Sequence, residues 1–179
     1  MTLPQSAPET PVPSAPSLTP DGVAAALGRI PSGLFVITWR EDGCDRGMLA
    51  SWVMQAGFDP PLVTVAVAPG RGLLAAVDAG RPFVVNVLAE TQRPLLARFG
   101  KPAAAGEDPF AGLGMGRAAC GAPTIVEAAG WLECVPVSRT AGSDAVPADH
   151  VVVLAKVDTA AAGSDATPLV HLRKNGLRY

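Results

Sequence analysis

Aromatic side chains are scarce in this 179-residue sequence. They make up 5% of it, as five Phe, three Trp and one Tyr. Because hydrophobic residues still account for 49%, the core must be built mostly from aliphatic side chains. Trp39, Trp52 and Trp131 therefore mark positions where a large apolar area is placed at one point.

An excess of charge of one sign is also missing. The formal net charge is -2 and no run of Lys or Arg occurs, whereas a nucleic-acid or acidic-membrane partner would need a basic patch. No apolar stretch approaches the roughly 20 residues of a membrane-spanning helix, and the first residues lack the basic and apolar regions of a secretory signal. These features favour a cytoplasmic protein with no nucleic-acid and no membrane partner.

Cysteine and histidine are too few for several kinds of site. Cys44, Cys120 and Cys134 are odd in number and widely spaced, which fits neither a disulfide framework nor a Cys-x-x-Cys pair. Each is expected to be buried or half-buried, as suits a reducing compartment. His150 and His171 are the only two histidines, so no histidine-built metal centre is predicted.

Familiar catalytic motifs are absent as well. The sequence contains no Gly-x-Ser-x-Gly elbow, no His-Glu-x-x-His pair and no Walker loop. A hydrolase built on Ser51 or Cys134 would lack any supporting local pattern. What remains is chemistry performed by a cofactor, for which the protein supplies position and electrostatics.

Turn residues and apolar periodicity divide the chain into short elements. Residues 1–18 are rich in Pro, Ser, Ala and Thr, which predicts a disordered tail ahead of one domain over 19–179. The Thr-Pro-Asp signal at 19–21 opens a helix that closes at Gly28. Strands are expected at 34–39, 47–58, 62–68, 83–89, 131–137, 150–158 and 168–172. Helices are expected at 71–79 and 92–99, and a long loop at 101–124.

This order of elements predicts a mainly β fold. Asp42-Gly43 between two apolar runs is a hairpin signal. Six or seven β-runs with only short helices favour an antiparallel barrel or sandwich, since βαβ units would need longer helices. An open α+β sheet is the alternative.

One stretch has an unusual composition for a core strand. MLASWVMQAGFDPP, from Met48 to Pro61, places two small residues immediately before Trp52 and ends at a double proline. In the structural interpretation, Ala50 and Ser51 only relieve crowding inside a barrel and Trp52 belongs to the core.

Four stretches of the sequence carry a resemblance to a known family. GMLASWVMQAGFDPPLVTVAV, FVVNVL and LLARFGKP, with the final H-RKNG-RY pattern, resemble the flavin reductase-like family of FMN-binding split barrels. Within that family the sequence is most similar to the flavin reductase module of cyanobacterial flavodiiron proteins, over residues 24–179. The resemblance implies an antiparallel split β-barrel of Greek-key type with short inserted helices.

The resemblance also implies which residues meet the flavin. They are Met48, Leu49, Ala50, Ser51, Trp52, Ala66, Val67, Ala68, Arg71, Asn86, Phe99, Gly100 and Lys101. Small residues at 50 and 51 suit this use, because they let backbone N–H groups approach a flat ring. Arg71, at a helix start, can pair with the FMN phosphate, and Lys101 can add a second charge. The alternatives are solvated cations at both positions.

Two further positions have competing interpretations. A structural hydrogen bond is an alternative role for Asn86, because a buried amide must be satisfied. Asp149-His150 matches the family's Gly-Asp-His motif, except that Ala148 replaces the glycine, and His171 matches a terminal His-x-Arg segment. The resemblance gives both histidines a catalytic role near the nicotinamide or flavin; both can equally be structural.

The implied reaction is hydride transfer from NADH or NADPH to FMN, with FAD as the alternative flavin. The alternative function is an FMN-carrying electron-transfer protein without its own nicotinamide site. The resemblance further implies a homodimer, and a monooxygenase or a metal-centre protein as electron acceptor.

Overall fold

The computed structural model describes residues 19–104, 106–142, 147–163 and 165–177. The described residues fall into two compact units, one of residues 19–30 with 173–177 and one within residues 31–172. The expected tail over 1–18 lies outside the described residues, and the single domain over 19–179 stays a prediction.

The smaller unit contains helix α1 (Pro20–Gly28), which confirms the expected helix. Thr19 is its N-cap, and the Thr19 hydroxyl accepts a hydrogen bond of 3.1 Å from the Gly22 N–H. The Gly176 N–H donates to the Ala24 carbonyl at 2.8 Å, so the C-terminal segment is bonded to the helix.

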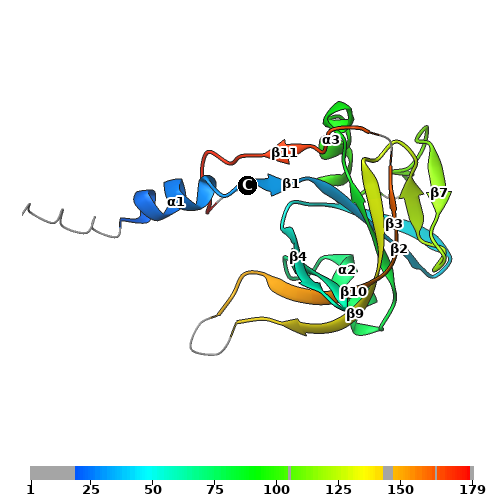
Figure 1. Cartoon of the computed structure of the whole chain (residues 1–179), viewed down its shortest axis with the longest axis horizontal. Helices are drawn as coiled ribbons and strands as arrows, with labels where there is room; N and C mark the ends of the chain where they lie inside the picture. The colour runs from blue at the N-terminus through cyan, green and yellow to red at the C-terminus, as the bar shows by residue number, and fades with distance from the viewer. Residues whose placement is uncertain (1–18, 105, 143–146, 164, 178–179) are drawn as a thin grey trace, which may run out of the picture. The chain divides into compact units, whose positions relative to one another are not determined.

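The larger unit is built on one seven-stranded sheet in which every pairing is antiparallel (Figure 1). Its strands are β2 (Phe35–Glu41), β3 (Cys44–Ala50), β4 (Val53–Phe58), β5 (Pro61–Val67), β6 (Phe83–Val87), β9 (Gly130–Thr140) and β10 (Val151–Ala162). Their spatial order is β3-β2-β6-β9-β10-β5-β4. The mainly β, antiparallel class is therefore confirmed.

The two edge strands of this sheet are consecutive in the chain. β3 ends at Ala50 and β4 begins at Val53, so only Ser51 and Trp52 join opposite edges. Three peptide steps span about 11 Å at most, because consecutive Cα atoms lie about 3.8 Å apart. The sheet must therefore curl until its edges meet at this crossover, which makes an open barrel. The single strand expected over 47–58 was wrong, since the chain leaves one edge and enters the other at 51–52.

The β2–β3 hairpin agrees with its sequence signal. Glu41 pairs with Cys44 around a two-residue turn, in which Asp42 has φ 50° and Gly43 has φ 79°. Positive φ at both central residues is the type I′ geometry that matches strand twist. The expectation that all three thiols are buried or half-buried was wrong for Cys44, which this turn leaves exposed.

Both faces of the sheet carry apolar clusters, which explains the nearly continuous apolar run of β2. Ile37 and Trp39 point into the barrel, where helix α2 (Gly72–Asp78) buries its leucines among the strands that curve around it in Figure 1. Val36 lies in a second cluster on the outer face, together with residues of helix α3 (Leu95–Phe99).

The long loop expected over 101–124 was only partly right. It contains strand β7 (Met115–Arg117), which pairs with β8 (Pro123–Ile125) in a separate two-stranded sheet. A second two-stranded sheet pairs β1 (Ser32–Gly33) with β11 (Val170–His171). A 3-10 helix, η1, covers Glu90–Gln92. No helix among the described residues is long and apolar enough to span a membrane.

Candidate functional site at the barrel crossover

Residues 48–52, at the end of β3 and in the crossover that follows, place their side chains on both faces of the barrel. Met48 and Ala50 are buried in the interior cluster, whereas Leu49 packs against the outer cluster that contains α3. Ser51 is half-buried and Trp52 remains 37% exposed. The structural interpretation therefore holds for the Ala50 side chain and is wrong for Trp52, which is not a core residue.

The end of β5 lies directly beside the crossover. The Ala66 N–H donates to the Trp52 carbonyl at 2.9 Å, and Ala66 also pairs with Val152 of β10. Ala66 and Ala68 are half-buried, while Val67 between them points inward and is 1% exposed. The register thus places small side chains between Trp52 and the start of β10.

His150 immediately precedes β10 and meets Trp52. The two ring centroids are 4.6 Å apart, with an interplanar angle of 58°. Nδ1 of His150 lies 3.0 Å from Oδ1 of Asp149, and the His150 side chain is 12% exposed against 95% for Asp149. The hydrogen bond from His150 holds the pKa of Asp149 below its ordinary value. This contact was missed from the sequence, because only the pairing of β10 with β5 brings the two segments together.

Arg71 occupies the N-cap of α2, as the sequence predicted for a residue at the helix start. Its backbone N–H bonds to the Ala68 carbonyl at 3.3 Å, which fixes it just beyond the end of β5. The side chain is half-buried, and it forms no ion pair or hydrogen bond with any other described residue. A half-buried cation that meets no carboxylate in the described part of the chain is suited to an anionic ligand group.

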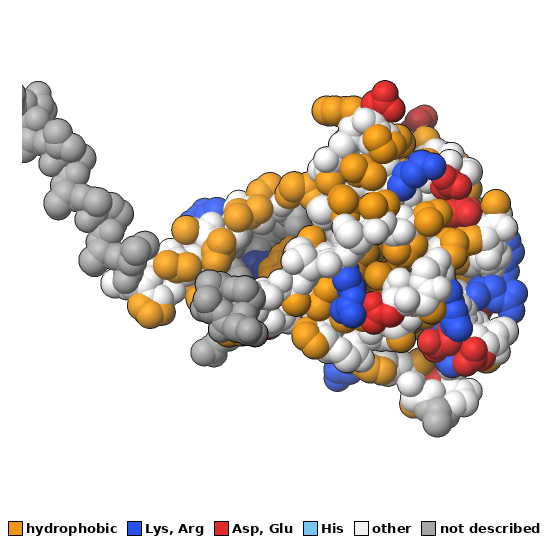
Figure 2. All heavy atoms as spheres, turned by 90° about the horizontal axis from the view of Figure 1, so that it is seen from below, with side chains coloured by type: hydrophobic (Ala, Val, Ile, Leu, Met, Phe, Trp, Pro, Cys, Tyr) orange, Lys and Arg blue, Asp and Glu red, His pale blue; other side chains and the backbone are white. Residues whose placement is uncertain are grey.

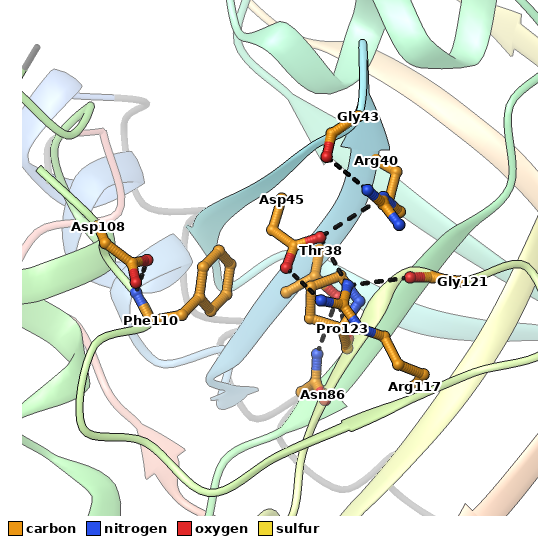
Figure 3. Close-up of polar contacts among 10 residues, drawn as sticks. All are labelled: Thr38, Arg40, Gly43, Asp45, Asn86, Asp108, Phe110, Arg117, Gly121 and Pro123. Carbon is orange, nitrogen blue, oxygen red and sulfur yellow. Dashed lines mark hydrogen bonds and ion pairs between the residues drawn. The ribbon is translucent and has the colours of Figure 1, made fainter. Parts of the chain in front are cut away.

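Both polar atoms of the Asn86 side chain are hydrogen-bonded within the protein. Its amide nitrogen donates to the Val36 carbonyl at 3.0 Å and to the Thr38 hydroxyl at 3.3 Å, and its oxygen accepts from the Ile125 N–H at 2.8 Å. Thr38 in turn donates to the Pro123 carbonyl at 2.5 Å, as Figure 3 shows. The structure supports the alternative role, a structural hydrogen-bonding group that ties β6 to β2 and β8.

Residues 99–101, at the end of α3 and just after it, lead from the core to the surface. Phe99 is 1% exposed and packs on Phe110, with ring centroids 5.4 Å apart. Gly100 lies next to the Leu49 side chain, and Lys101 is exposed. Only Gly100 and Lys101 therefore extend from this cluster toward solvent near β3.

His171 lies on β11 rather than on the main sheet. It pairs with Ser32 of β1, on the strand that leads into β2, and its side chain is half-buried.

The sequence also gave no sign of a charged cluster on the outer side of β3. Arg117 of β7 makes a bidentate ion pair with Asp45, at 2.6 and 2.7 Å, and donates to the Gly121 carbonyl (Figure 3). Arg40 approaches the same carboxylate at 3.7 Å. The hydrogen bond to Asp45 raises the pKa of Arg117. In Figure 2, basic and acidic side chains of the larger unit lie beside one another.

Two thiols are unsuited to reaction. Burial raises the pKa of Cys134 to about 12, and burial also raises the pKa of Cys120. Because the thiolate is the nucleophile, neither thiol is activated at neutral pH.

Comparison with known proteins shows what this barrel is. The model of the flavin reductase like domain matches residues 27–176. Diflavin flavoprotein A 1 of Synechocystis is 38% identical over 156 residues, which cover 86% of this chain and 26% of that protein. The chain thus spans about a quarter of the length of the curated relatives it matches.

Solved structures agree. An NADH:FAD oxidoreductase of Streptomyces globisporus has a TM-score of 0.73 at 26% identity, covering 86% of this chain and 87% of that one. The styrene monooxygenase flavin reductase of Pseudomonas putida has a TM-score of 0.70 at 26% identity, with 87% and 93% covered. The chain belongs to the family of flavin reductase like domains.

Proposed function

We propose that this protein is an NAD(P)H-dependent flavin reductase that uses the barrel crossover as its flavin site. The observation that supports this most is that three features lie near one another. They are a crossover with small residues, the half-buried Arg71, which meets no carboxylate among the described residues, and the Trp52–His150 contact. Membership of the flavin reductase family supports the same assignment.

The residues present fit a flavin mononucleotide. Ala50 and Ser51 would admit the polar edge of the flat ring to the backbone, and Ala66 and Ala68 leave room beside it. Arg71 would hold the phosphate, with Lys101 as a second candidate cation. Met48, Val67, Asn86 and Phe99 are buried, so they would contribute to the wall and its rigidity rather than by side-chain hydrogen bonds.

Bound flavin supplies the redox chemistry, by accepting a hydride from a reduced nicotinamide. The protein's own contribution is orientation, because two stacked rings at contact distance need little acid–base help. Trp52 would border the bound ring, and His150, which contacts Trp52, is a candidate to meet the nucleotide. His171, on β11 beside the strand that leads to β2, is a second candidate. The lack of a catalytic triad is then expected.

Three finer points belong to this proposal. FMN is favoured over FAD because one arginine at the end of β5 suits a single phosphate, although the structural relative from Streptomyces is an FAD enzyme by name. NADH and NADPH are both retained as reductants. A cytoplasmic location follows from dependence on a nicotinamide nucleotide pool.

Anaerobic stopped-flow spectroscopy tests the reaction. Protein loaded with FMN should lose its flavin absorbance when NADH or NADPH is added, with saturation in nucleotide. Absence of bleaching with either nucleotide would exclude the reductase, and failure to bind FMN or FAD would exclude a flavin site altogether.

A second candidate is an FMN-carrying electron-transfer module. It is favoured by the diflavin flavoproteins, of which this chain spans only about a quarter, so that a neighbouring domain or a separate metal-centre protein would exchange electrons with the flavin. A monooxygenase is the corresponding acceptor for a free-standing reductase. Flavin that is reduced by a chemical donor but not by NAD(P)H would favour the module.

A homodimer is also proposed. Edge strand β4 exposes Met54 by 67% and Phe58 by 89%, which is unusual for large apolar side chains at a strand edge. Burying them against a second copy would cover this edge. Light scattering should give twice the chain mass, and a monomer would contradict the proposal.

A further inference from the structure

Gly47 leaves room on the outer face of β3 for two aromatic rings. A Cβ atom on Gly47 would lie 2.8 Å from Cε1 of Phe99 and 3.0 Å from Cζ of Phe110. Non-bonded carbon atoms attract best at roughly 3.5–4.0 Å, so a side chain at this position would push both rings away. Gly47 lies within a strand and has no positive φ, which leaves the close approach of the rings as the reason for a glycine.

Phe110 connects this part of β3 to helix α3. Its ring centroid lies 5.4 Å from that of Phe99, the last residue of α3, and the two residues are 8% and 1% exposed. Tilted aromatic pairs at such distances add stabilisation beyond the burial of their area. The loop that carries Phe110 is therefore packed against both β3 and the end of α3.

Hydrogen bonds hold this loop in place around Phe110. The Phe110 N–H donates to Oδ1 of Asp108 at 2.9 Å, as Figure 3 shows, and the Leu113 N–H donates to the Phe110 carbonyl at 3.0 Å. Arg98 of α3 donates to the Ala111 carbonyl at 2.5 Å. The Phe110 ring is thus fixed by its own backbone, and it can fix the end of α3 in turn.

The end of α3 leads directly to Lys101. The Gly100 N–H bonds to the Leu96 carbonyl at 2.9 Å, and a Cβ atom on Gly100 would lie 3.9 Å from Cδ2 of Leu49, two residues before the crossover. Lys101 is exposed, and its side chain forms no ion pair or hydrogen bond with any other described residue. Because a lysine side chain loses much rotamer freedom on binding, a fixed backbone beneath it favours capture of an anionic group.

We propose that Phe110, packed against Gly47 and Phe99, is a positioning residue that holds Lys101 near the crossover as a phosphate-binding cation. This inference deepens the proposed function and rests on it, because the phosphate would belong to the flavin or to the nicotinamide nucleotide. Phe110 would act through Phe99 and the backbone of residues 100–101, without touching the ligand itself.

Fluorescence titration with FMN and with riboflavin, which lacks the phosphate, tests the flavin as its source. Phe110→Ala should weaken FMN binding about fivefold and leave riboflavin binding unchanged, as Lys101→Ala should. In the double variant the two losses should not add, because Phe110 acts only through Lys101. Ile125→Ala is the matched control. Ile125 is 3% exposed in the same outer cluster, so this variant should lose stability and keep the ratio of the two affinities.

Reduction kinetics test the nucleotide as the source of the phosphate. With NADH or NADPH as donor, Phe110→Ala should raise the KM about fivefold and leave kcat unchanged, which is the pattern of a lost binding contact. N-benzyl dihydronicotinamide has no phosphate, so the variant and the wild type should oxidise it equally well. Lys101→Ala should again match Phe110→Ala, and Ile125→Ala should behave as wild type.

Equal and non-additive losses for Phe110→Ala and Lys101→Ala in either experiment support the proposal, and the experiment that responds identifies the phosphate. If Phe110→Ala behaves like Ile125→Ala in both, or if its loss adds to that of Lys101→Ala, the positioning role is overturned while the reductase function stands. If Phe110→Ala does not fold, Gly47→Ala carries the same decision, because its one added methyl group displaces both rings.

The same measurements separate this inference from the proposed function. A wild type that binds flavin but is bleached by neither nucleotide is no reductase, and the titrations with FMN and riboflavin then decide the role of Phe110 alone. A wild type that binds neither flavin overturns both proposals.

Discussion

Two polar clusters of the barrel differ in how they use their hydrogen-bonding groups. The side chains of Thr38 and Asn86 hydrogen-bond to partners in the protein, and both residues are 0% exposed. At the crossover, by contrast, the half-buried Arg71 meets no carboxylate among the described residues. Under the proposed function, the cluster around Asn86 should stabilise the fold and the crossover should bind the ligand. Substitutions should therefore separate stability from binding.

The largest effect is expected at Asn86. Asn86→Leu leaves the Val36 carbonyl, the Thr38 hydroxyl and the Ile125 N–H without their partner in a dry site, so the free energy of unfolding should fall by about 3 kcal/mol. Urea denaturation measures it. Asn175→Leu, at an exposed position in the smaller unit, is the control and should change stability by less than about 0.5 kcal/mol. A stable Asn86→Leu protein that fails only to bind flavin would reverse the comparison.

Ser51→Leu should act on binding instead. A branched side chain at the crossover blocks access to the backbone, so the Kd for FMN should rise at least about 100-fold, or roughly 2.7 kcal/mol, while the unfolding midpoint changes little. Ser51→Ala is the control, because it keeps the site small and removes only the hydroxyl. Fluorescence titration with FMN measures this Kd. Unchanged binding in the leucine variant would mean that the small residues at 50–51 serve only barrel packing.

Arg71→Ala should have a smaller effect that depends on the phosphate. Losing one charge-assisted contact should weaken FMN binding about tenfold, roughly 1.4 kcal/mol. Riboflavin lacks the phosphate, so its affinity should not change. Equal losses for both flavins would contradict a phosphate contact, and Lys101→Ala measured in the same way shows whether the second cation takes part.

The smallest effect is expected at the exposed ion pair of Arg117 and Asp45. Arg117→Ala should lower the free energy of unfolding by about 1 kcal/mol or less, because exposed ion pairs contribute little even with bidentate geometry. The loss should shrink further in high salt. A loss above about 2 kcal/mol, measured by urea denaturation, would mean that the β7–β8 sheet depends on this pair.

Local signals in the sequence were sufficient where the structure itself is local. Asp42-Gly43 takes the two positive φ angles of its turn, and Arg71 does stand at a helix start. The break at Ser51-Trp52 was not predictable in this way, since apolar residues continue across it and only closure of the barrel decides where the strand ends. Strand β7 was hidden for another reason, because three residues among glycines carry no periodic pattern.

The candidate site was predictable residue by residue but not as an arrangement. The resemblance named Trp52 and His150 separately, and only the register of β10 on β5 shows that they touch. Likewise, only the structure shows that the hydrogen bonds of the Asn86 side chain go to β2 and β8. A position near a site in sequence is therefore not evidence of an open functional group there.

The crossover also has a consequence for the order of folding. β2–β3 and β4–β5 are two local hairpins joined by Ser51 and Trp52, and local pairs form early because little chain entropy is lost in closing them. The next strand beside β2 is β6, and the next strand beside β5 is β10; both are synthesised later. The two hairpins therefore stay unconnected within the sheet until these strands have formed. His150, which contacts Trp52 and immediately precedes β10, is thus among the last residues to reach its native position. Pulsed hydrogen exchange should accordingly protect the β2–β3 amides before those at the start of β10, and simultaneous protection would refute this order.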